Sequence, residues 1–151
     1  MRCDAVTGEK QNLGRLGESI ARAYLKKHGY RILATNYRTP SGEVDIVAYD
    51  HGILSFVEVK TRTSLQFGTP DTAITPHKMK QISKVAQQYV TRHHLDDISW
   101  RFDCVYIMIT EGKRPTGLKK IIGRLFPSVS RPEAEIELVK NAFDLDSLHR
   151  G

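Results

Sequence analysis

The 151-residue sequence lacks the features that mark secreted, membrane-spanning or zinc-binding proteins. It has only two cysteines, Cys3 and Cys104, which stand far apart in unlike contexts and indicate neither a disulfide framework nor a zinc site. No segment approaches the ~18 consecutive apolar residues of a membrane span, and the N-terminus has no signal-peptide core. A single-domain cytoplasmic protein with no membrane association is therefore expected by default.

Several familiar catalytic signatures are also missing. The six histidines show no zinc-ligand spacing, and the chain has neither a phosphate-binding P-loop nor a G-x-S-x-G nucleophile motif. His93 and His94 fall at the end of a predicted helix, where positive charge is favoured, so a structural role is expected for them.

Acidic residues are scarce in two long stretches of a chain with 23 Lys plus Arg, 17 Asp plus Glu and a net charge of +6. Between Lys60 and His94 the only acid is Asp71. Residues 112–131 contain no acid but six Lys or Arg, at positions 113, 114, 119, 120, 124 and 131. Such blocks suggest an electrostatic footprint for nucleic acid, although a solvated basic surface gives the same pattern.

Apolar periodicity and turn residues predict an α/β fold with a mixed central sheet and helices against it. Residues 1–11 are polar and aperiodic, so we expect a flexible leader followed by one domain over residues 12–146. Helices are predicted at about 12–28 and from Pro76 onward, with Thr75 as the N-cap. Strands are predicted at 30–37, 43–49, 53–60, 100–109 and 135–140, with a basic loop at about 112–132. On the second helix, Lys78, Lys80 and Lys84 are expected to face outward.

Glu58 and Lys60 interrupt a segment that otherwise has the pattern of a buried strand. The apolar run around them (Ile53, Leu54, Phe56, Val57 and Val59) is typical of a central strand covered on both faces. Burying a carboxylate and an ammonium group there is costly, which suggests that the charges have a function. Residues two apart on a strand share a face, so Glu58 and Lys60 are expected to project together.

Asp45 lies on the preceding predicted strand, within reach of that face, so two carboxylates and a lysine are expected to converge at a sheet edge. Magnesium prefers oxygen ligands and is often held by one or two carboxylates plus a phosphate. Asp45 and Glu58 would hold Mg²⁺ (or Mn²⁺), and the Val59 carbonyl would add a ligand. Lys60 would orient or deprotonate the attacking water, or stabilise charge on the phosphate. The alternative is a solvated Glu58–Lys60 ion pair with Asp45 as a turn residue.

The linked motifs of the chain resemble those of the YraN-like family, which belongs to the PD-(D/E)XK nuclease superfamily. The motifs are Gly14-Arg15-Leu16-Gly17-Glu18, Asn36-Tyr37-Arg38, Gly42-Glu43-Val44-Asp45, Phe56-Val57-Glu58-Val59-Lys60-Thr61-Arg62 and Arg101-Phe102-Asp103. The resemblance implies a restriction-endonuclease-like fold and a magnesium-dependent nuclease acting on DNA. Branched and single-stranded DNA are the candidate substrates. The chain departs from the family in its longer segment at about 112–132, and in having Val44 where the superfamily has proline.

The resemblance also implies roles for individual residues. Asp45, Glu58 and Lys60 fall on the metal-and-water triad of the superfamily. Glu18 matches an acidic residue that the first helix contributes to related sites, although from the sequence alone it has the pattern of a solvated helix charge. Arg62 and Lys78 match positions that would contact phosphate.

Two other functions remain open from the sequence: a non-catalytic nucleic-acid-binding protein with a nuclease fold, and an adaptor whose basic face meets an acidic protein. For either nucleic-acid function, the basic block extends the expected contact surface to Lys80 and Lys84. DNA is the favoured partner over RNA. Because two cuts in a duplex need two sites, a homodimer is also considered, although the sequence shows no interface.

Overall fold

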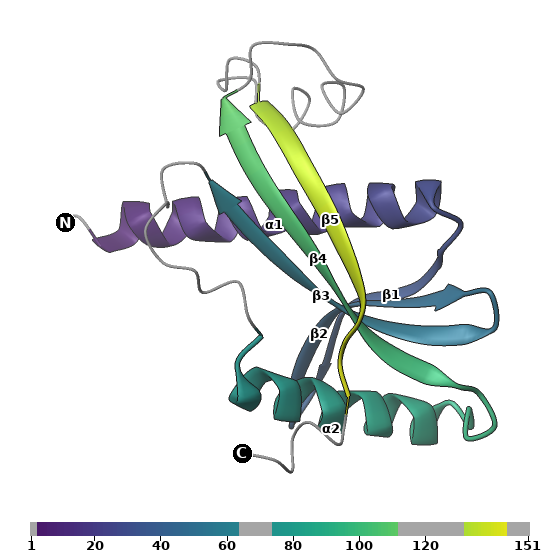
Figure 1. Cartoon of the computed structure of the whole chain (residues 1–151). Coiled ribbons are helices and arrows are strands. Elements are labelled where there is room, and N and C mark those ends of the chain that lie inside the picture. The colour runs from purple at the N-terminus through teal and green to yellow at the C-terminus, as the bar shows by residue number, and fades with distance from the viewer. Residues whose placement is uncertain (1–2, 64–73, 112–131, 145–151) are drawn as a thin grey trace.

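Five strands form one mixed sheet with a helix on each face in the computed structural model, which describes residues 3–63, 74–111 and 132–144 (Figure 1). In chain order the elements are α1 (Cys3–Lys27), β1 (Arg31–Thr39), β2 (Gly42–Asp50), β3 (Ile53–Thr63), α2 (Pro76–Arg92), β4 (Trp100–Glu111) and β5 (Pro132–Phe143). The strands lie in the order β1-β2-β3-β4-β5; β3 and β4 are parallel, and the other neighbours are antiparallel. The architecture confirms the predicted α/β fold with a mixed sheet and is consistent with a nuclease-like fold.

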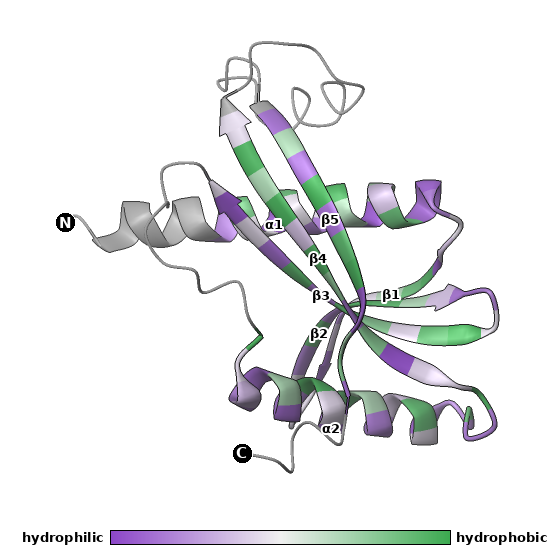
Figure 2. Cartoon of the chain, viewed as in Figure 1, coloured by the Kyte–Doolittle hydropathy of each residue, from purple (hydrophilic) through white to green (hydrophobic). Residues whose placement is uncertain are grey.

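The two helices cover opposite faces of the sheet and create two apolar cores. On one face, α1 packs against residues that include Val57 and Val105. On the other face, α2 packs against residues that include Phe56 and Phe102. Neighbouring residues of β3 therefore enter different cores, as the two-residue period of a strand requires, and β3 is the buried central strand that its sequence predicts. Along β5, the two-residue period appears instead as hydrophilic residues that alternate with hydrophobic ones (Figure 2).

The first helix is longer than its apolar pattern predicts. It begins at Cys3, so the predicted start of this helix at about residue 12 is wrong. Good helix formers such as Ala5, Glu9 and Lys10 allow a helix that is anchored by its packed C-terminal half to propagate backwards without an apolar stripe. The N-terminal half of α1 consequently extends beyond the sheet (Figure 1). Neither α1 nor α2, the helices of the described ranges, is long and apolar enough to cross a membrane.

Several strands are also longer than predicted. β3 continues to Thr63, and β5 runs over 12 residues from Pro132 to Phe143 instead of 135–140. The predicted N-cap of α2 is confirmed, because Thr75 Oγ1 accepts a hydrogen bond from the Lys78 N–H at 3.3 Å. The predicted basic loop lies outside the described residues, except for Pro132.

A glycine allows α1 to approach β3 closely. A Cβ atom on Gly17 would lie 1.7 Å from Oγ1 and 2.9 Å from Cβ of Thr61. A side chain of any size is therefore excluded at this crossing unless one of the two elements moves. The next residue on the helix is Glu18, so this contact helps to fix its position relative to the sheet.

A set of buried charges joins β2, β3, β4 and β5 at the opposite end of β3. Asp103 is fully buried and accepts hydrogen bonds from Ser55 Oγ (2.6 Å), Arg101 Nε (2.8 Å) and the backbone N–H of Asn141 (3.0 Å). Asp50, also buried, accepts hydrogen bonds from Arg101 and Lys140. Because both carboxylates have cationic partners, this set of contacts is accounted for by the fold alone.

Candidate active site

Glu58 is a buried carboxylate on the central strand and is only 4% exposed. Its Oε1 lies 3.2 Å from Nζ of Lys60, and its Oε2 lies 3.3 Å from Nζ of Lys78. The Lys78 contact has ion-pair distance without hydrogen-bond geometry, so the buried Oε2 has no hydrogen-bond partner. Glu58 and Lys60 thus project together, as predicted, but their ion pair is largely removed from solvent rather than exposed.

Asp45 lies where β2 separates from β3. The pairing of these strands ends at Ile46 and Val57. Val44 packs in the α2 core and Ile46 in the α1 core, although residues two apart on a regular strand share a face. The side-chain alternation therefore breaks at Asp45, whose Oδ2 accepts a hydrogen bond of 2.7 Å from the backbone N–H of Val59.

This arrangement corrects the expected location of the site. The acidic residues do not meet at an edge of the sheet, because β3 is its middle strand. They meet at an opening inside the sheet, where the backbone of β3 has lost β2 as its partner and Asp45 satisfies one of its N–H groups. Asp45 and Glu58 are thereby brought close enough for their charges to interact.

The electrostatics show that the two carboxylates interact. Burial and the negative charge of Glu58, in that order of importance, raise the pKa of Asp45 from 3.8 to about 7. The hydrogen bond from Val59 and the positive charge of Lys78 oppose the rise, and Glu18 adds to it. Asp45 and Glu58 therefore repel one another even though Lys60 and Lys78 pair with Glu58, and a bound cation would relieve this repulsion.

Glu18 belongs to the surroundings of Asp45, as its effect on the Asp45 pKa shows. Its Oε2 accepts a hydrogen bond of 3.0 Å from Nδ2 of Asn36 on β1. Asn36 adopts a left-handed backbone conformation with φ of 50°, which asparagine tolerates better than most residues. No role for Asn36 was predicted, although it belongs to the Asn36-Tyr37-Arg38 motif that resembles the YraN-like family.

The predicted basic residues divide into two groups. Lys78 was expected to face outward, and this is wrong: it lies in the first turns of α2, where its long side chain reaches Glu58 and is 23% exposed. Arg62 lies on β3, two residues beyond Lys60, and both line the same hollow in the sheet face. Lys80 and Lys84 are exposed on α2. In the part of the chain that the structure describes, the ion pairs of Glu58 are with Lys60 and Lys78 and not with these two lysines.

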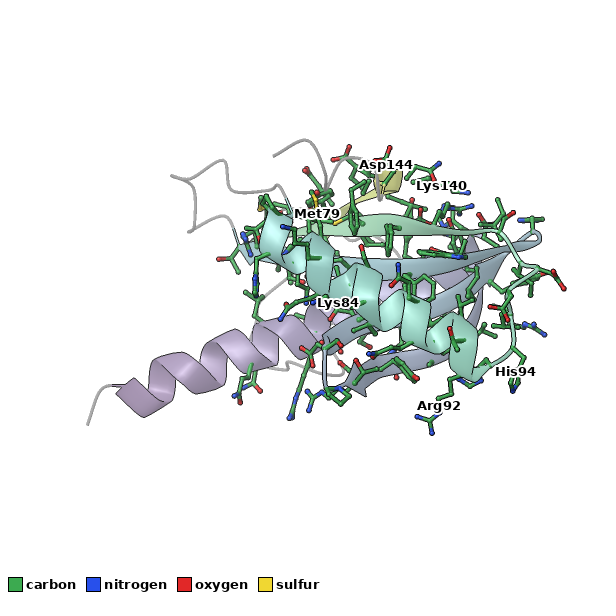
Figure 3. The ribbon with its side chains drawn as sticks, turned by 90° about the horizontal axis from the view of Figure 1, so that it is seen from below. Met79, Lys84, Arg92, His94, Lys140 and Asp144 are labelled. Carbon is green, nitrogen blue, oxygen red and sulfur yellow. The ribbon has the colours of Figure 1, made fainter. Side chains whose placement is uncertain are left out.

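Lys84 belongs to a separate basic groove between α2 and the β1–β2 turn. The groove has a volume of about 590 Å³ and is lined by Ser41, Lys84, Gln87, Gln88, Thr91 and Arg92. Figure 3 shows Lys84 midway along α2 and Arg92 near its C-terminal end, where the guanidinium group extends away from the helix. Glu43, on the strand of Asp45, forms an exposed ion pair of 2.8 Å with Arg38 and is not part of the site.

The donor set fits a hard divalent cation better than a soft one. Within residues 3–63, 74–111 and 132–144, no group of three or more His, Cys, Asp or Glu side chains is placed to hold a metal ion. A metal held by Asp45 and Glu58 alone would need backbone oxygen or water to complete its shell, which is the usual manner of Mg²⁺ binding. Oε2 of Glu58, which has an ion-pair contact with Lys78 but no hydrogen bond, supplies a lone pair for this purpose.

Comparisons with known proteins identify relatives over most of the chain. Residues 17–107 match the family described as "Uncharacterised protein family UPF0102". A UPF0102 protein of Trichlorobacter lovleyi is 43% identical over 136 residues, which are 89% of this chain and 92% of the relative. A UPF0102 protein of Alkaliphilus metalliredigens is 44% identical over 104 residues (69% and 91%), and one of Geobacter sulfurreducens is 48% identical over 103 residues (68% and 80%). The resemblance to the YraN-like family is thereby confirmed, and the chain belongs to the UPF0102 (YraN) family.

Proposed function

We propose that this protein is a metal-dependent nuclease that hydrolyses phosphodiester bonds in DNA. The observation that carries the proposal is the pair of interacting carboxylates at the opening in the sheet. Glu58 is buried with one oxygen that lacks a hydrogen bond, and Asp45 has a pKa raised to about 7 by burial and by Glu58. Such a pair is costly for the fold and suits a divalent cation.

Asp45 and Glu58 would hold Mg²⁺ or Mn²⁺. In a strand, the N–H and C=O of one residue point to the same neighbour. Since the Val59 N–H reaches Asp45, the Val59 carbonyl faces the same opening and is the third candidate ligand. When bound, the cation would supply a nucleophilic water at neutral pH and offset charge on the phosphate.

The lysines of the site would act on the phosphate and the attacking water. Lys60 and Lys78 pair with different oxygens of Glu58, so their ammonium groups flank the carboxylate on two sides. From these positions Lys60 donates a hydrogen bond to the attacking water or to a phosphate oxygen, and Lys78 contacts the phosphate. Glu18, held by Asn36, keeps the negative potential near Asp45 high and thereby favours cation binding.

The test is cleavage of labelled single-stranded, branched and duplex DNA by purified wild-type protein in Mg²⁺, Mn²⁺ or EDTA. Cleavage is expected with either metal and none in EDTA. Glu58→Gln and Lys60→Ala are expected to abolish cleavage while leaving DNA binding in place. Glu43→Gln is the matched control, because Glu43 is an acid close to Asp45 in sequence whose exposed partner is Arg38.

Two outcomes would refute the proposal. Equal cleavage by wild type and Glu58→Gln would show that the activity does not come from this site. DNA binding without cleavage under any metal would favour a non-catalytic nucleic-acid-binding protein, for which the basic groove of Lys84 and Arg92 is the natural contact surface. Absence of binding to DNA and RNA at low salt would favour the adaptor.

A further inference from the structure

A hollow in the sheet face adjoins the proposed active site. The ends of β3 and β4 and the start of β5 extend beyond α2 (Figure 1), and on their surface lies a cavity of about 520 Å³. Besides the apolar residues Ile107, Ile136 and Val139, its lining has three rows of side chains: Lys60 and Arg62 from β3, Tyr106 and Met108 from β4, and Glu135 and Glu137 from β5. The cavity volume falls in the range of small-molecule sites, roughly 300–1,000 Å³.

The strand register sets these rows directly beside one another. Lys60 is paired with Tyr106, and Tyr106 is paired with Glu137. Arg62 is paired in the same way with Met108, which is paired with Glu135. The hollow therefore has a cationic wall, a floor of one aromatic and one thioether side chain, and an anionic wall. Neighbouring strands are about 4.8 Å apart, so the two walls are separated by about 10 Å.

We propose that this hollow is a subsite for one unpaired nucleotide of a single-stranded nucleic acid, contiguous with the phosphate at the active site. The proposal rests on the proposed nuclease function, and it narrows the substrate to single strands. The sugar-phosphate backbone lies along Lys60 and Arg62, and the base contacts Tyr106 and Met108. Base contact with an aromatic side chain is the usual device of proteins that bind single strands.

The anionic wall argues against a duplex in the same place. A duplex carries phosphates on both flanks, and the flank over β5 would meet the exposed carboxylates of Glu135 and Glu137. Like charges brought together in this way disfavour the wrong partner. A single strand has one phosphate backbone, which matches the one cationic wall.

The same wall implies a base preference. Carboxylates accept hydrogen bonds from exocyclic amino groups, as Glu and Asp do from cytosine N4. Glu137, next to Tyr106, is placed to contact the edge of a base lying on the floor. Cytosine has the amino group that thymine lacks, so oligo(dC) is expected to bind more tightly than oligo(dT).

The test is equilibrium binding in EDTA, measured by fluorescence anisotropy with labelled oligo(dC), oligo(dT) and a duplex of equal length. Wild type is expected to bind single strands more tightly than the duplex. Tyr106→Ala is expected to weaken single-strand binding by about tenfold, as base–aromatic contacts are worth ~1–3 kcal/mol, whereas Tyr106→Phe keeps it. Tyr49→Ala is the matched control, because Tyr49 is a partly buried tyrosine of the same sheet that pairs with Leu54.

Glu137→Gln supplies an independent test, because Glu137 is exposed and its substitution leaves the core untouched. It is expected to reduce the preference for oligo(dC) and to strengthen duplex binding. Unchanged single-strand binding by Tyr106→Ala, or a duplex bound as tightly as single strands by wild type, would overturn the subsite. Metal-dependent cleavage that needs Glu58 would then still support the nuclease. Conversely, the expected binding pattern without cleavage in any metal would support the subsite and refute the nuclease.

Discussion

Replacing Gly17 with alanine changes how closely α1 can pack on β3, and this distance positions Glu18 near Asp45. A Cβ on residue 17 would lie 1.7 Å from Oγ1 and 2.9 Å from Cβ of Thr61, whereas ordinary contact begins at 3.4 Å. Rotating the Thr61 hydroxyl would not relieve the contact with Thr61 Cβ. The helix or the strand must therefore move, and Glu18 moves with the helix.

The size of the effect follows from two opposing contributions. Overpacking typically costs about 1–3 kcal/mol, and this contact is severe enough for the upper part of that range. Alanine recovers up to about 1 kcal/mol through its higher helix propensity. We therefore expect Gly17→Ala to lower the free energy of unfolding by roughly 2 kcal/mol. Gly14→Ala is the matched control, because no atom lies within 4 Å of its added Cβ, and it should raise that free energy by up to about 1 kcal/mol.

The assay is urea unfolding followed by circular dichroism, together with DNA cleavage. Adding Thr61→Ala to Gly17→Ala removes two of the three clashing atoms and should recover part of the lost stability, which a double-mutant cycle measures. Cleavage should fall in Gly17→Ala and stay at the wild-type level in Gly14→Ala. Equal stability of the two glycine variants would refute the claim that α1 needs this close crossing.

Three further predictions concern the buried carboxylates. In EDTA, Asp45→Asn should stabilise the protein above pH 7, because burial and Glu58 raise the pKa of Asp45 from 3.8 to about 7; urea unfolding should show this gain shrinking as the pH falls from 7 towards 4. Asp103→Asn should destabilise the protein by about 3–5 kcal/mol, since it removes a fully buried carboxylate that pairs with Arg101. Burial acts to raise the pKa of Asp50, but hydrogen bonds from Lys140 and Arg101 outweigh it and hold the pKa well below 3.8. The ionised Asp50 carboxylate therefore stabilises the folded protein above pH 4, and this contribution is lost as the pH falls further. The free energy of unfolding of the wild type should fall more steeply below pH 4 than that of Asp50→Asn.

The central strand and its charged face were predictable because both follow from local periodicity. An apolar run interrupted only by Glu58 and Lys60 required a strand with two covered faces, and the two-residue period then placed both charges together. The structure has both features. The N-cap at Thr75 was predictable for the same reason, since Thr-Pro before an amphipathic segment is a local signal.

The remaining features depend on contacts between distant segments. The break of alternation at Asp45 arises where β2 loses β3 as its partner, and no local pattern encodes the end of a pairing. Lys78 was assigned outward because its place in the helix period is polar, but α2 starts close enough to β3 for a long side chain to reach Glu58. The early start of α1 was missed because its first residues have no apolar stripe, on which the predicted boundary depended.

Two buried acids on neighbouring strands, Asp103 on β4 and Glu58 on β3, differ in how fully their carboxylate oxygens are hydrogen-bonded. Each oxygen of Asp103 accepts hydrogen bonds, from Ser55, Arg101 and the Asn141 backbone, so its charge stabilises the native state. Glu58 has ion-pair partners in Lys60 and Lys78, but one of its oxygens lacks a hydrogen bond, and it lies close enough to Asp45 to raise the pKa of that second carboxylate. An unsatisfied buried group costs about 1–3 kcal/mol or more, and such costs are characteristic of functional positions. The same Asp-to-Asn substitution should destabilise the protein at residue 103, whereas at residue 45 it should stabilise the protein above pH 7, because burial and Glu58 raise the pKa of Asp45.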